Sequence, residues 1–344
     1  MEKVNLMRKI AVKLSKEFSS NPSVIGILLS GSVALGKVHE KSDIDLIVIH
    51  DGSFRKDVKF IEGFKVEIWN YPMDVFRDYF ESERLRNRED TWMWAGLWIN
   101  LLKNSIILFD RQNLLHDWKW KAQNWNWTIK EINGAVNYSI KNLNVTRNFL
   151  SKNSFFSLIS IRDASYCLCS AYLMIFNRIP SIRPKDFYQE FLAIRDEVGF
   201  SRLFTLINDL DDLNESLLHE LIRELGHWIN KECKSKLRGP YTEYMNTVNL
   251  LRKRNFEAAL LSARYASYWL CFQILNNRGK RMKANLYDSM NHIDALSSLK
   301  SSDEEFYSFY KRIHFAGKWN KTAISQVVNE FEFFFSDVMR RVKC

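Results

Sequence analysis

The chain has few of the residues that build covalent or metal-bound frameworks. Its 344 residues include only five cysteines, five prolines and twelve glycines. No two cysteines form a CxxC pair, and none has metal-ligand spacing with the seven histidines. The sequence therefore predicts neither a disulfide framework nor a zinc site. Cys167 and Cys169 lie in an apolar helical stretch, where a small buried side chain is the expected role.

Long apolar runs are also missing. No run approaches the roughly 20 apolar residues that cross a membrane. The N-terminal segment 1–18 has helical periodicity with charges throughout and no signal-peptide core. We therefore expect a cytoplasmic protein that does not enter a membrane. A length of 344 residues, with 46% hydrophobic and 26% charged residues, predicts a globular chain of two or three domains.

The charge balance is positive, with a formal net charge of +10 and a pI near 9.2. Such a surface suits a polyanionic partner such as RNA, or the triphosphate of a nucleotide. A generally lysine-rich solvated surface explains it equally well, because no basic tail is present.

The most informative stretch is residues 24–49. Gly31 and Ser32 follow an apolar run, and about ten residues later Asp43-Ile44-Asp45 leads into a second apolar run. Side chains alternate between the faces of a strand, so Asp43 and Asp45 are predicted to share one face. Paired carboxylates suit hard cations such as Mg²⁺. A glycine lets the backbone approach a phosphate, to which the Ser32 hydroxyl and nearby N–H groups can donate.

Gly31-Ser32 together with Ser42-Asp43-Ile44-Asp45-Leu46 resembles the nucleotidyltransferase superfamily typified by DNA polymerase β. The form is most similar to a small branch that includes kanamycin-type nucleotidyltransferases and the nucleotidyltransferase antitoxins paired with HEPN proteins. The resemblance covers the N-terminal third of the chain. It implies transfer of a nucleotidyl group with two Mg²⁺ ions about 3.5–4 Å apart.

The resemblance also implies a set of site residues. The superfamily usually supplies a third carboxylate from a later strand, and the alternating segment 64–71 offers Glu67. Many members carry Asp there, so the longer Glu leaves a metal ligand and a general base both open. Lys37 is equally a phosphate ligand or a solvated turn lysine. The expected catalytic and metal-binding residues are Asp43, Asp45 and Glu67, and those expected to bind the nucleotide are Gly31, Ser32, Lys37 and Ser42.

The pattern predicts an α+β N-terminal domain over residues 1–112. It has a helix at 1–20, strands at 24–30, 43–49 and 64–71, a helix at 73–83, and a helix that turns into a short edge strand over 98–110. Related nucleotidyltransferases often close their sheet with such an edge strand.

Helical periodicity dominates the remainder of the chain, which contains an internal repeat. Residues 144–173 match 246–275 at a constant offset of 102, with eleven identities in thirty positions. We therefore predict two related helical bundles, 113–235 and 241–344, joined by a linker at 234–240. The helix pattern and domain order resemble HEPN-type bundles and the C-terminal domain of kanamycin-type enzymes.

The repeated motif Arg-x-Ala-Ser-Tyr-x-Leu-x-Cys contains Arg162 and Arg264. Its small residues at helical spacing indicate close helix packing as the first role, with nucleotide or acceptor contact as the alternative. HEPN ribonucleases carry Arg and His separated by four to six intervening residues in a bundle helix. Arg223 and His227 are one residue too close for that pattern, so ribonuclease activity is disfavoured.

The resemblance implies an enzyme that transfers an NMP, with ATP as the commonest donor in the superfamily. The acceptor is a hydroxyl on a small molecule, a protein or RNA, and pyrophosphate leaves. An antitoxin-like module that acts through partner binding is the alternative, and an RNA-directed terminal transferase is a third reading. Kanamycin-type relatives often pair subunits, which leaves a homodimer open.

Overall fold

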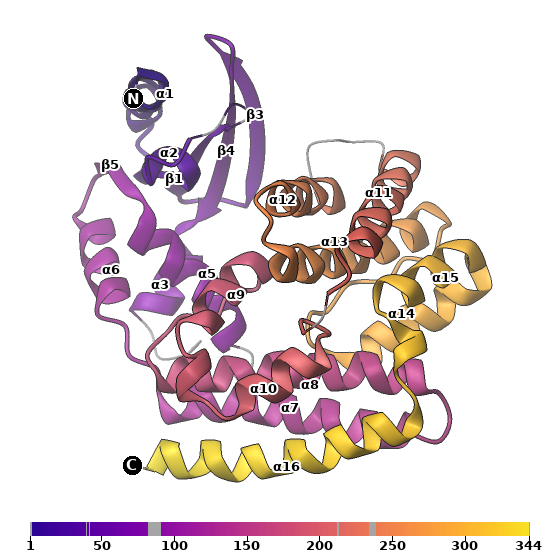
Figure 1. Ribbon diagram of the computed structural model, residues 1–344. Coiled ribbons are helices and arrows are strands. Elements are labelled where there is room, and N and C mark those ends of the chain that lie inside the picture. Colours follow the sequence, from indigo (N-terminus) through magenta and orange to yellow (C-terminus); the bar gives the residue numbers. More distant parts are fainter. Residues whose placement is uncertain are drawn as a thin grey trace. The chain divides into compact units, whose positions relative to one another are not determined.

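We describe a computed structural model of the chain, which covers residues 2–38, 40, 42–81, 91–211, 213–233 and 239–343. The chain divides into two compact units, Met1–Glu131 and Ile132–Cys344, and each is described by itself (Figure 1).

The first unit is built on a mixed five-stranded sheet in the order β3-β4-β2-β1-β5. Strands β2 and β4 pair in parallel, and the other neighbours pair antiparallel. This arrangement confirms the predicted α+β class. In chain order the elements are α1 (Glu2–Ser19), β1 (Val24–Ser30), α2 (Gly31–Ala34), β2 (Ile44–His50), β3 (Arg55–Ile61), β4 (Phe64–Pro72), α3 (Met73–Phe80), α5 (Thr91–Asn104), β5 (Ile106–Asp110) and α6 (Leu114–Gln123).

One face of this sheet carries a hydrophobic core beneath α1. Met7, Ile10 and Leu14 recur at helical spacing on α1 and belong to the same buried cluster as Leu46 and Ile68 of the sheet. Because strand side chains alternate, burying these even-numbered positions of β2 and β4 places the odd-numbered positions on the opposite face. The core packing of α1 therefore determines which face the carboxylates of β2 and β4 occupy.

The predicted strands 24–30, 43–49 and 64–71 correspond to β1, β2 and β4, and β2 begins at Ile44, one residue after Asp43. Strand β3 was not predicted. It is an edge strand whose residues are mostly half-buried or exposed, so its sequence lacks a strong apolar alternation. A tight turn at Glu62 and Gly63, with φ of 51° and 80°, joins it to β4. Residues 82–83 of the predicted helix 73–83 lie outside the described residues.

The second unit is helical. Its elements are α7 (Ile129–Phe149, which begins in the first unit), α8 (Ser154–Ile175), α9 (Pro184–Leu192), η1 (Arg195–Glu197), α10 (Phe200–Ile207), α11 (Glu215–Glu232), α12 (Pro240–Arg252), α13 (Phe256–Asn277), α14 (Ser289–Ser302), α15 (Glu304–Ile313), η2 (Ala316–Lys318) and α16 (Lys321–Lys343).

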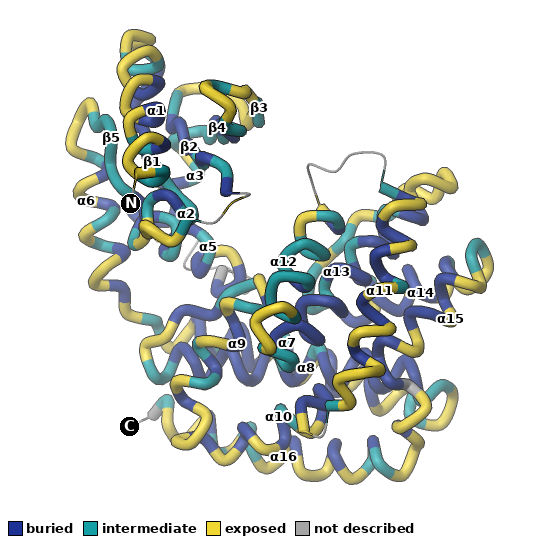
Figure 2. Tube along the Cα trace, turned by 45° about the horizontal axis from the view of Figure 1, so that its top comes forward, coloured by how far each residue is buried: buried dark blue, intermediate teal, exposed yellow. Residues whose placement is uncertain are grey.

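Helices α8 and α13 form the centre of this unit (Figure 2). Helix α8 is long and apolar enough to cross a membrane by length and composition, but 83% of the apolar window is buried inside the unit. Such burial is typical of the core helix of a water-soluble protein. The cytoplasmic location stays a prediction.

The internal repeat is visible in the helices themselves. Both α8 and α13 have 22 residues, and each begins after an asparagine whose side chain accepts hydrogen bonds from the first turn, Asn153 or Asn255. The two copies exchange helices: α11 packs against α12 and α13, and α16 packs against α8 and α10. The predicted boundaries 113–235 and 241–344 stay predictions, and residues 234–238 of the expected linker lie outside the described part of the chain.

Candidate active site

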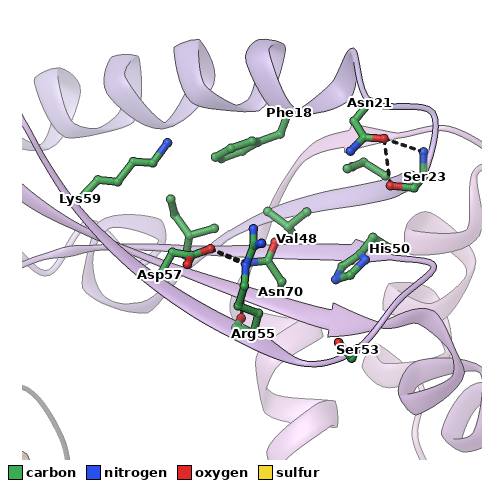
Figure 3. Close-up of a pocket in the computed structure, with 12 residues that line it drawn as sticks. Phe18, Asn21, Ser23, Val48, His50, Ser53, Arg55, Asp57, Lys59 and Asn70 are labelled. Atoms are coloured by element: carbon green, nitrogen blue, oxygen red, sulfur yellow. Dashed lines mark hydrogen bonds and ion pairs between the residues drawn. The ribbon is translucent and has the colours of Figure 1, made fainter.

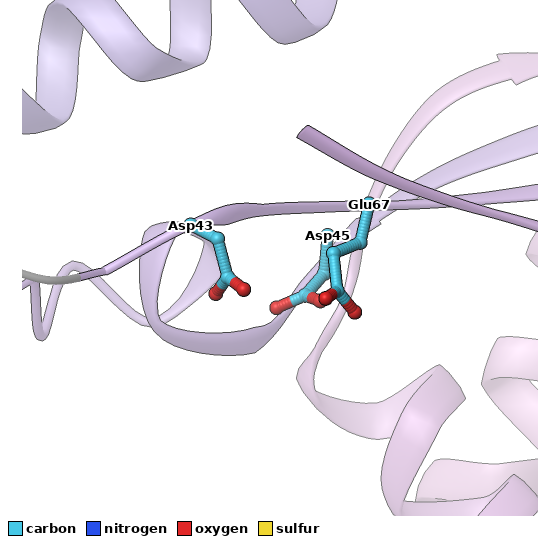
Figure 4. A group of neighbouring side chains, drawn as sticks. All are labelled: Asp43, Asp45 and Glu67. Carbon is cyan, nitrogen blue, oxygen red and sulfur yellow. The ribbon is translucent and has the colours of Figure 1, made fainter. Parts of the chain in front are cut away.

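Three carboxylates gather on the sheet face opposite α1. Asp43, Asp45 and Glu67 each offer a ligand atom, and these atoms all lie within 4.8 Å of one another (Figure 4). Asp45 of β2 is the direct parallel neighbour of Glu67 on β4, and Asp43 immediately precedes β2. The structure therefore brings together the three residues that were predicted to hold metal.

Gly31 lies against this cluster. Glycine has no side chain, and a Cβ atom added to Gly31 would lie 2.2 Å from Asp45 Oδ2. Its φ of +66° is also in the region that disfavours residues other than glycine. The neighbouring Ser30 is paired with Asp45 across β1 and β2. Both backbone conformation and space thus require glycine beside the Asp45 carboxylate.

The segment after Gly31 is a single short helical turn, α2. Arg8 of α1 donates from Nε and Nη2 to the carbonyl oxygen of Val33, at 3.2 and 3.1 Å, and from Nη2 to that of Ala34, at 2.9 Å. The Lys37 N–H donates to the carbonyl of Ser32. These bonds fix the backbone around Ser32.

The predicted nucleotide-binding residues have different degrees of exposure. Gly31 and Ser32 are half-buried, Lys37 is exposed, and Ser42 is buried at the entry to β2. Their roles toward a nucleotide stay predictions.

Two lysines contact the carboxylates. Lys56 of β3 and Lys65 of β4 each donate to a different oxygen of Glu67, and Lys65 also lies 3.4 Å from Asp43 Oδ2. The Lys56 side chain is only 6% exposed, and its ammonium lies 3.7 Å from the centroid of the Trp69 ring. Lys65 is less enclosed, at 24% exposed. The ammonium groups therefore act as counter-charges to a cluster that would otherwise carry three negative charges.

These contacts set the protonation of Glu67. Burial by itself would raise the pKa of Glu67, but hydrogen bonds and charges from Lys56 and Lys65 outweigh burial and hold that pKa below its ordinary value. Burial likewise opposes the charge of Lys65, yet Glu67 and then Asp43 raise the pKa of its ammonium. Glu67 is therefore an anion at neutral pH, and a carboxylate with a lowered pKa is a weak proton acceptor.

Lys56 was not among the predicted site residues, because its strand β3 was not predicted. The signal that could have found β3 is the turn at Glu62 and Gly63 just before the predicted strand 64–71, because such a turn indicates a hairpin with a preceding strand. Val58 of β3 pairs with Glu67 and Lys56 pairs with Trp69, which brings the lysine to the carboxylate face.

A separate hollow of about 340 Å³ lies on the other face of the sheet, near the end of α1 (Figure 3). Its lining includes Phe18, Val48, Arg55, Lys59 and Asn70. None of the residues predicted for the metal or the nucleotide lines this hollow. It is therefore distinct from the carboxylate cluster.

The donor set fits a divalent cation that prefers oxygen. All three candidate ligands are carboxylates, which Mg²⁺ and similar hard cations prefer, and two of them, Asp43 and Asp45, are half-buried. Asp43, Asp45 and Glu67 are the residues that would hold it.

Comparison with known proteins gives one family match. Residues 11–99 match the model of the nucleotidyltransferase domain family. No curated protein matches the chain. Among solved structures, a nucleotidyltransferase-like protein from Exiguobacterium sibiricum aligns over 89% of this chain and 91% of its own, with 13% sequence identity and a TM-score of 0.41. A likeness at this level has no weight in the functional assignment. The matched residues 11–99 include the whole carboxylate cluster and the segment that begins with Gly31.

Proposed function

Residues 11–99 belong to the nucleotidyltransferase domain family, and from this premise we propose that the chain is a metal-dependent enzyme that transfers an NMP from a nucleoside triphosphate to an acceptor hydroxyl. ATP is the proposed donor, and pyrophosphate is the leaving product. The acceptor belongs to a small molecule, a protein or an RNA. The observation that supports this proposal best is the convergence of Asp43, Asp45 and Glu67 within the matched domain.

In this reaction the protein contributes mainly by positioning the substrates and neutralising charge. An acceptor oxygen attacks the α-phosphorus, the bond to the β-phosphate oxygen breaks, and charge accumulates on the phosphoryl oxygens. Bound divalent cations supply neutralisation of that charge. Asp43 and Asp45 would hold these cations, and Gly31 lets the backbone approach the Asp45 carboxylate closely, so that the N–H groups of the following turn could donate to the triphosphate.

Glu67 serves in this proposal as an anionic ligand on the acceptor side. Both of its oxygens already accept charged hydrogen bonds, from Lys56 and Lys65. A carboxylate held in this way is oriented for ligation and is poorly suited to take a proton from the acceptor. Lys56 is enclosed against Trp69 and stays as an orienting contact, whereas the more exposed Lys65 can move aside.

The decisive experiment is transfer of label from an α-³²P nucleoside triphosphate with Mg²⁺. The full chain is incubated in parallel with an RNA pool, with candidate protein partners and with aminoglycosides, and labelled acceptor and pyrophosphate are both measured. Asp45→Asn is expected to lower transfer by at least about 10²–10³-fold, the usual effect of removing one group that stabilises transition-state charge.

Asp51→Asn is the matched control, because Asp51 is an exposed carboxylate just beyond the end of β2. It is expected to keep wild-type transfer. Calorimetric titration with Mn²⁺ provides a second readout, in which Asp45→Asn is expected to bind the metal more weakly. Wild-type transfer and Mn²⁺ binding by Asp45→Asn would refute the proposal. Absence of transfer to every acceptor, with intact metal and nucleotide binding, would favour the partner-binding alternative.

A further inference from the structure

The order of strands in the sheet separates the two sides of the carboxylate cluster. Ser30 of β1 pairs with Asp45 of β2, and Asp45 pairs with Glu67 of β4. Glu67 in turn pairs with Val58 of β3, the edge strand. The Gly31 turn, where the triphosphate is proposed to bind, directly follows β1. Strand β3 therefore lies on the side of the cluster that is away from the triphosphate.

Phe60 projects from β3 on this side of the cluster. It is 75% exposed, the highest value among the large hydrophobic residues in the described part of the chain. Phe60 pairs with Lys65 on β4, and paired residues of antiparallel strands point to the same face, so Phe60 shares the face of Glu67. Glu67 is its diagonal neighbour across the ladder, a separation of about 7–8 Å between strand positions. Its ring is therefore open to a molecule that is bound at the cluster.

Lys65 lies between Phe60 and the cluster. Its ammonium donates to Glu67 and lies 3.4 Å from Asp43 Oδ2, and its side chain is 24% exposed. This ammonium is repelled once the carboxylates hold a cation, and its flexible stem lets it turn away from them. Because Phe60 is its direct partner across the ladder, a negatively charged group beside the Phe60 ring is within reach of Lys65.

The charges on this face favour an acceptor that is itself negatively charged. The positions of β3 and β4 that share the face are Lys56, Val58, Phe60, Lys65, Glu67, Trp69 and Tyr71. Glu67 is the one acidic residue among these strand positions, and Lys56 and Lys65 already donate to its two oxygens. On this face the two strands therefore offer no further carboxylate to the ammonium groups of an aminoglycoside. An aromatic ring beside an ammonium group suits a base and its phosphate instead.

From these observations, and on the basis of the proposed function, we propose that the acceptor is a ribonucleotide unit. Its base stacks on Phe60, its phosphate contacts Lys65, and a ribose hydroxyl lies at the carboxylate cluster. Such a unit occurs at the 3′ end of a single-stranded RNA and in a free nucleotide. Stacking on a single aromatic side chain accepts any base, because every base has a π face.

The transfer step then joins two nucleotides. The ribose oxygen attacks the α-phosphorus of the nucleoside triphosphate, and a phosphodiester bond forms. The bond from that phosphorus to the β-phosphate oxygen breaks, and pyrophosphate leaves with the electron pair. The hydroxyl proton passes to solvent water, because Glu67 is a weak proton acceptor. Phe60 and Lys65 position the acceptor and take no part in bond making.

The test compares three acceptors with the full chain, α-³²P ATP and Mg²⁺: a short oligo(A) RNA, AMP and kanamycin. Label is expected on the RNA or on AMP and not on kanamycin, and the first two arms distinguish an RNA end from a free nucleotide. Fluorescence anisotropy of 5′-fluorescein-labelled oligo(A) gives the Kd for the same unit without relying on turnover.

Variants of Phe60 locate the stacking. Phe60→Ala is expected to raise the Kd for oligo(A) and the KM for the labelled acceptor at least about fivefold, the lower end of the effect of losing one stacked base. The kcat and the affinity for Mn²⁺ are expected to change little. Phe60→Leu stays apolar but has no ring and should behave like Phe60→Ala, whereas Phe60→Trp should keep wild-type values.

Phe333→Ala is the matched control, because Phe333 is a similarly exposed phenylalanine, 65% exposed on α16 of the other unit. It is expected to keep the wild-type Kd and KM. Wild-type values in Phe60→Ala, or an equal loss in Phe333→Ala, would overturn the proposal. Label on kanamycin or a protein, with none on RNA or AMP, would overturn it and leave the proposed nucleotidyl transfer standing. Absence of label on every acceptor would overturn both.

Discussion

The two units each contain a cluster of ionisable side chains, and the clusters differ in how their charges are satisfied. In the first unit three carboxylates face two lysines, and the side chains of Asp43 and Lys65 are 34% and 24% exposed. In the second unit two arginines share Asp209, and all three side chains are less than a tenth exposed. Backbone carbonyls complete the second cluster, whereas the counter-charges described for the first are the ammonium groups of Lys56 and Lys65.

This difference separates a cluster that is available to a ligand from one that holds the fold together. Lysine ammonium groups on long stems can be displaced by a metal ion. Guanidinium groups tied to fixed carbonyls at helix ends cannot move without unfolding their surroundings. The bonds from Arg162 and Arg264 to backbone carbonyls and to Asp209 confirm the prediction that these arginines serve packing first.

Asp209 gives the strongest test of this difference between the two clusters. Asp209→Asn leaves two buried guanidinium groups with a neutral partner, and we expect a loss of about 3–5 kcal/mol in the free energy of unfolding, typical of a broken buried pair. Urea denaturation measures this loss. Glu332→Gln is the control, because Glu332 pairs with Arg147 at the surface and such pairs contribute at most about 1 kcal/mol. A loss at Asp209 as small as that of the control would show that the arginines do not depend on the carboxylate.

Gly31→Ala tests the close approach in the first unit. We expect a loss of about 1–2 kcal/mol from the positive φ, with additional loss from the contact with Asp45, and a loss of nucleotidyl transfer. Gly63→Ala is the matched control, because Gly63 has a φ of +80° and nothing within 4 Å of the added Cβ. Gly63→Ala should lose only the stability that the positive φ costs, and it should keep full nucleotidyl transfer. Equal stability and equal transfer in the two variants would contradict a role for the space at Gly31.

Lys65→Ala tests whether the ammonium competes with a metal ion. Removal of a positive charge a few ångströms from Asp43 and Glu67 is expected to raise Mn²⁺ affinity by roughly tenfold, since about 1.4 kcal/mol of charge repulsion disappears. Calorimetric titration measures this change. Lys59→Ala removes a lysine from the other face of the sheet, near Phe18, and should leave the affinity unchanged. Weaker binding by Lys65→Ala would mean that Lys65 supports the metal site.

The smallest expected effect concerns pH. The pKa of Glu67 lies below its ordinary value of 4.5, so its ion pairs stabilise the fold above the pKa of the unfolded chain and this contribution is lost as pH falls through the folded pKa. The difference in unfolding free energy between wild type and Glu67→Gln should therefore be constant at neutral pH and shrink in acid. Urea denaturation from pH 7 to pH 3 measures it. A difference that grows toward acid would contradict the assigned ion pairs.

Much of the first unit could be predicted because its signals are local. Strands β1, β2 and β4 are apolar enough to be recognised alone, and Asp43, Asp45 and Glu67 lie at positions that strand alternation places on one face. Strand β3 could not be recognised in this way, because an edge strand gains its order from the ladder with β4. Lys56 was missed together with the strand that carries it.

In the second unit, too, some features could be predicted from the sequence repeat and others could not. The identical residues shared by segments 144–173 and 246–275 predicted two matching helices. The structure confirms this, because α8 and α13 have the same length and both begin after a capping asparagine. The shared role of Asp209 was not predictable from that alignment. Asp209 lies outside the matched segments, and the equivalent position after α15 is Phe315, over which Arg264 lies.

The sequence by itself determined which residues of β2 and β4 face the same way and which helices repeat, because side-chain alternation and helical period are properties of the local chain. The tertiary structure alone decided the pairing of Lys56 with Glu67, the exchange of α11 and α16 between the copies, and the sharing of one aspartate by two arginines. Each of these depends on contacts between different elements of the fold, whose free energy has no local signature.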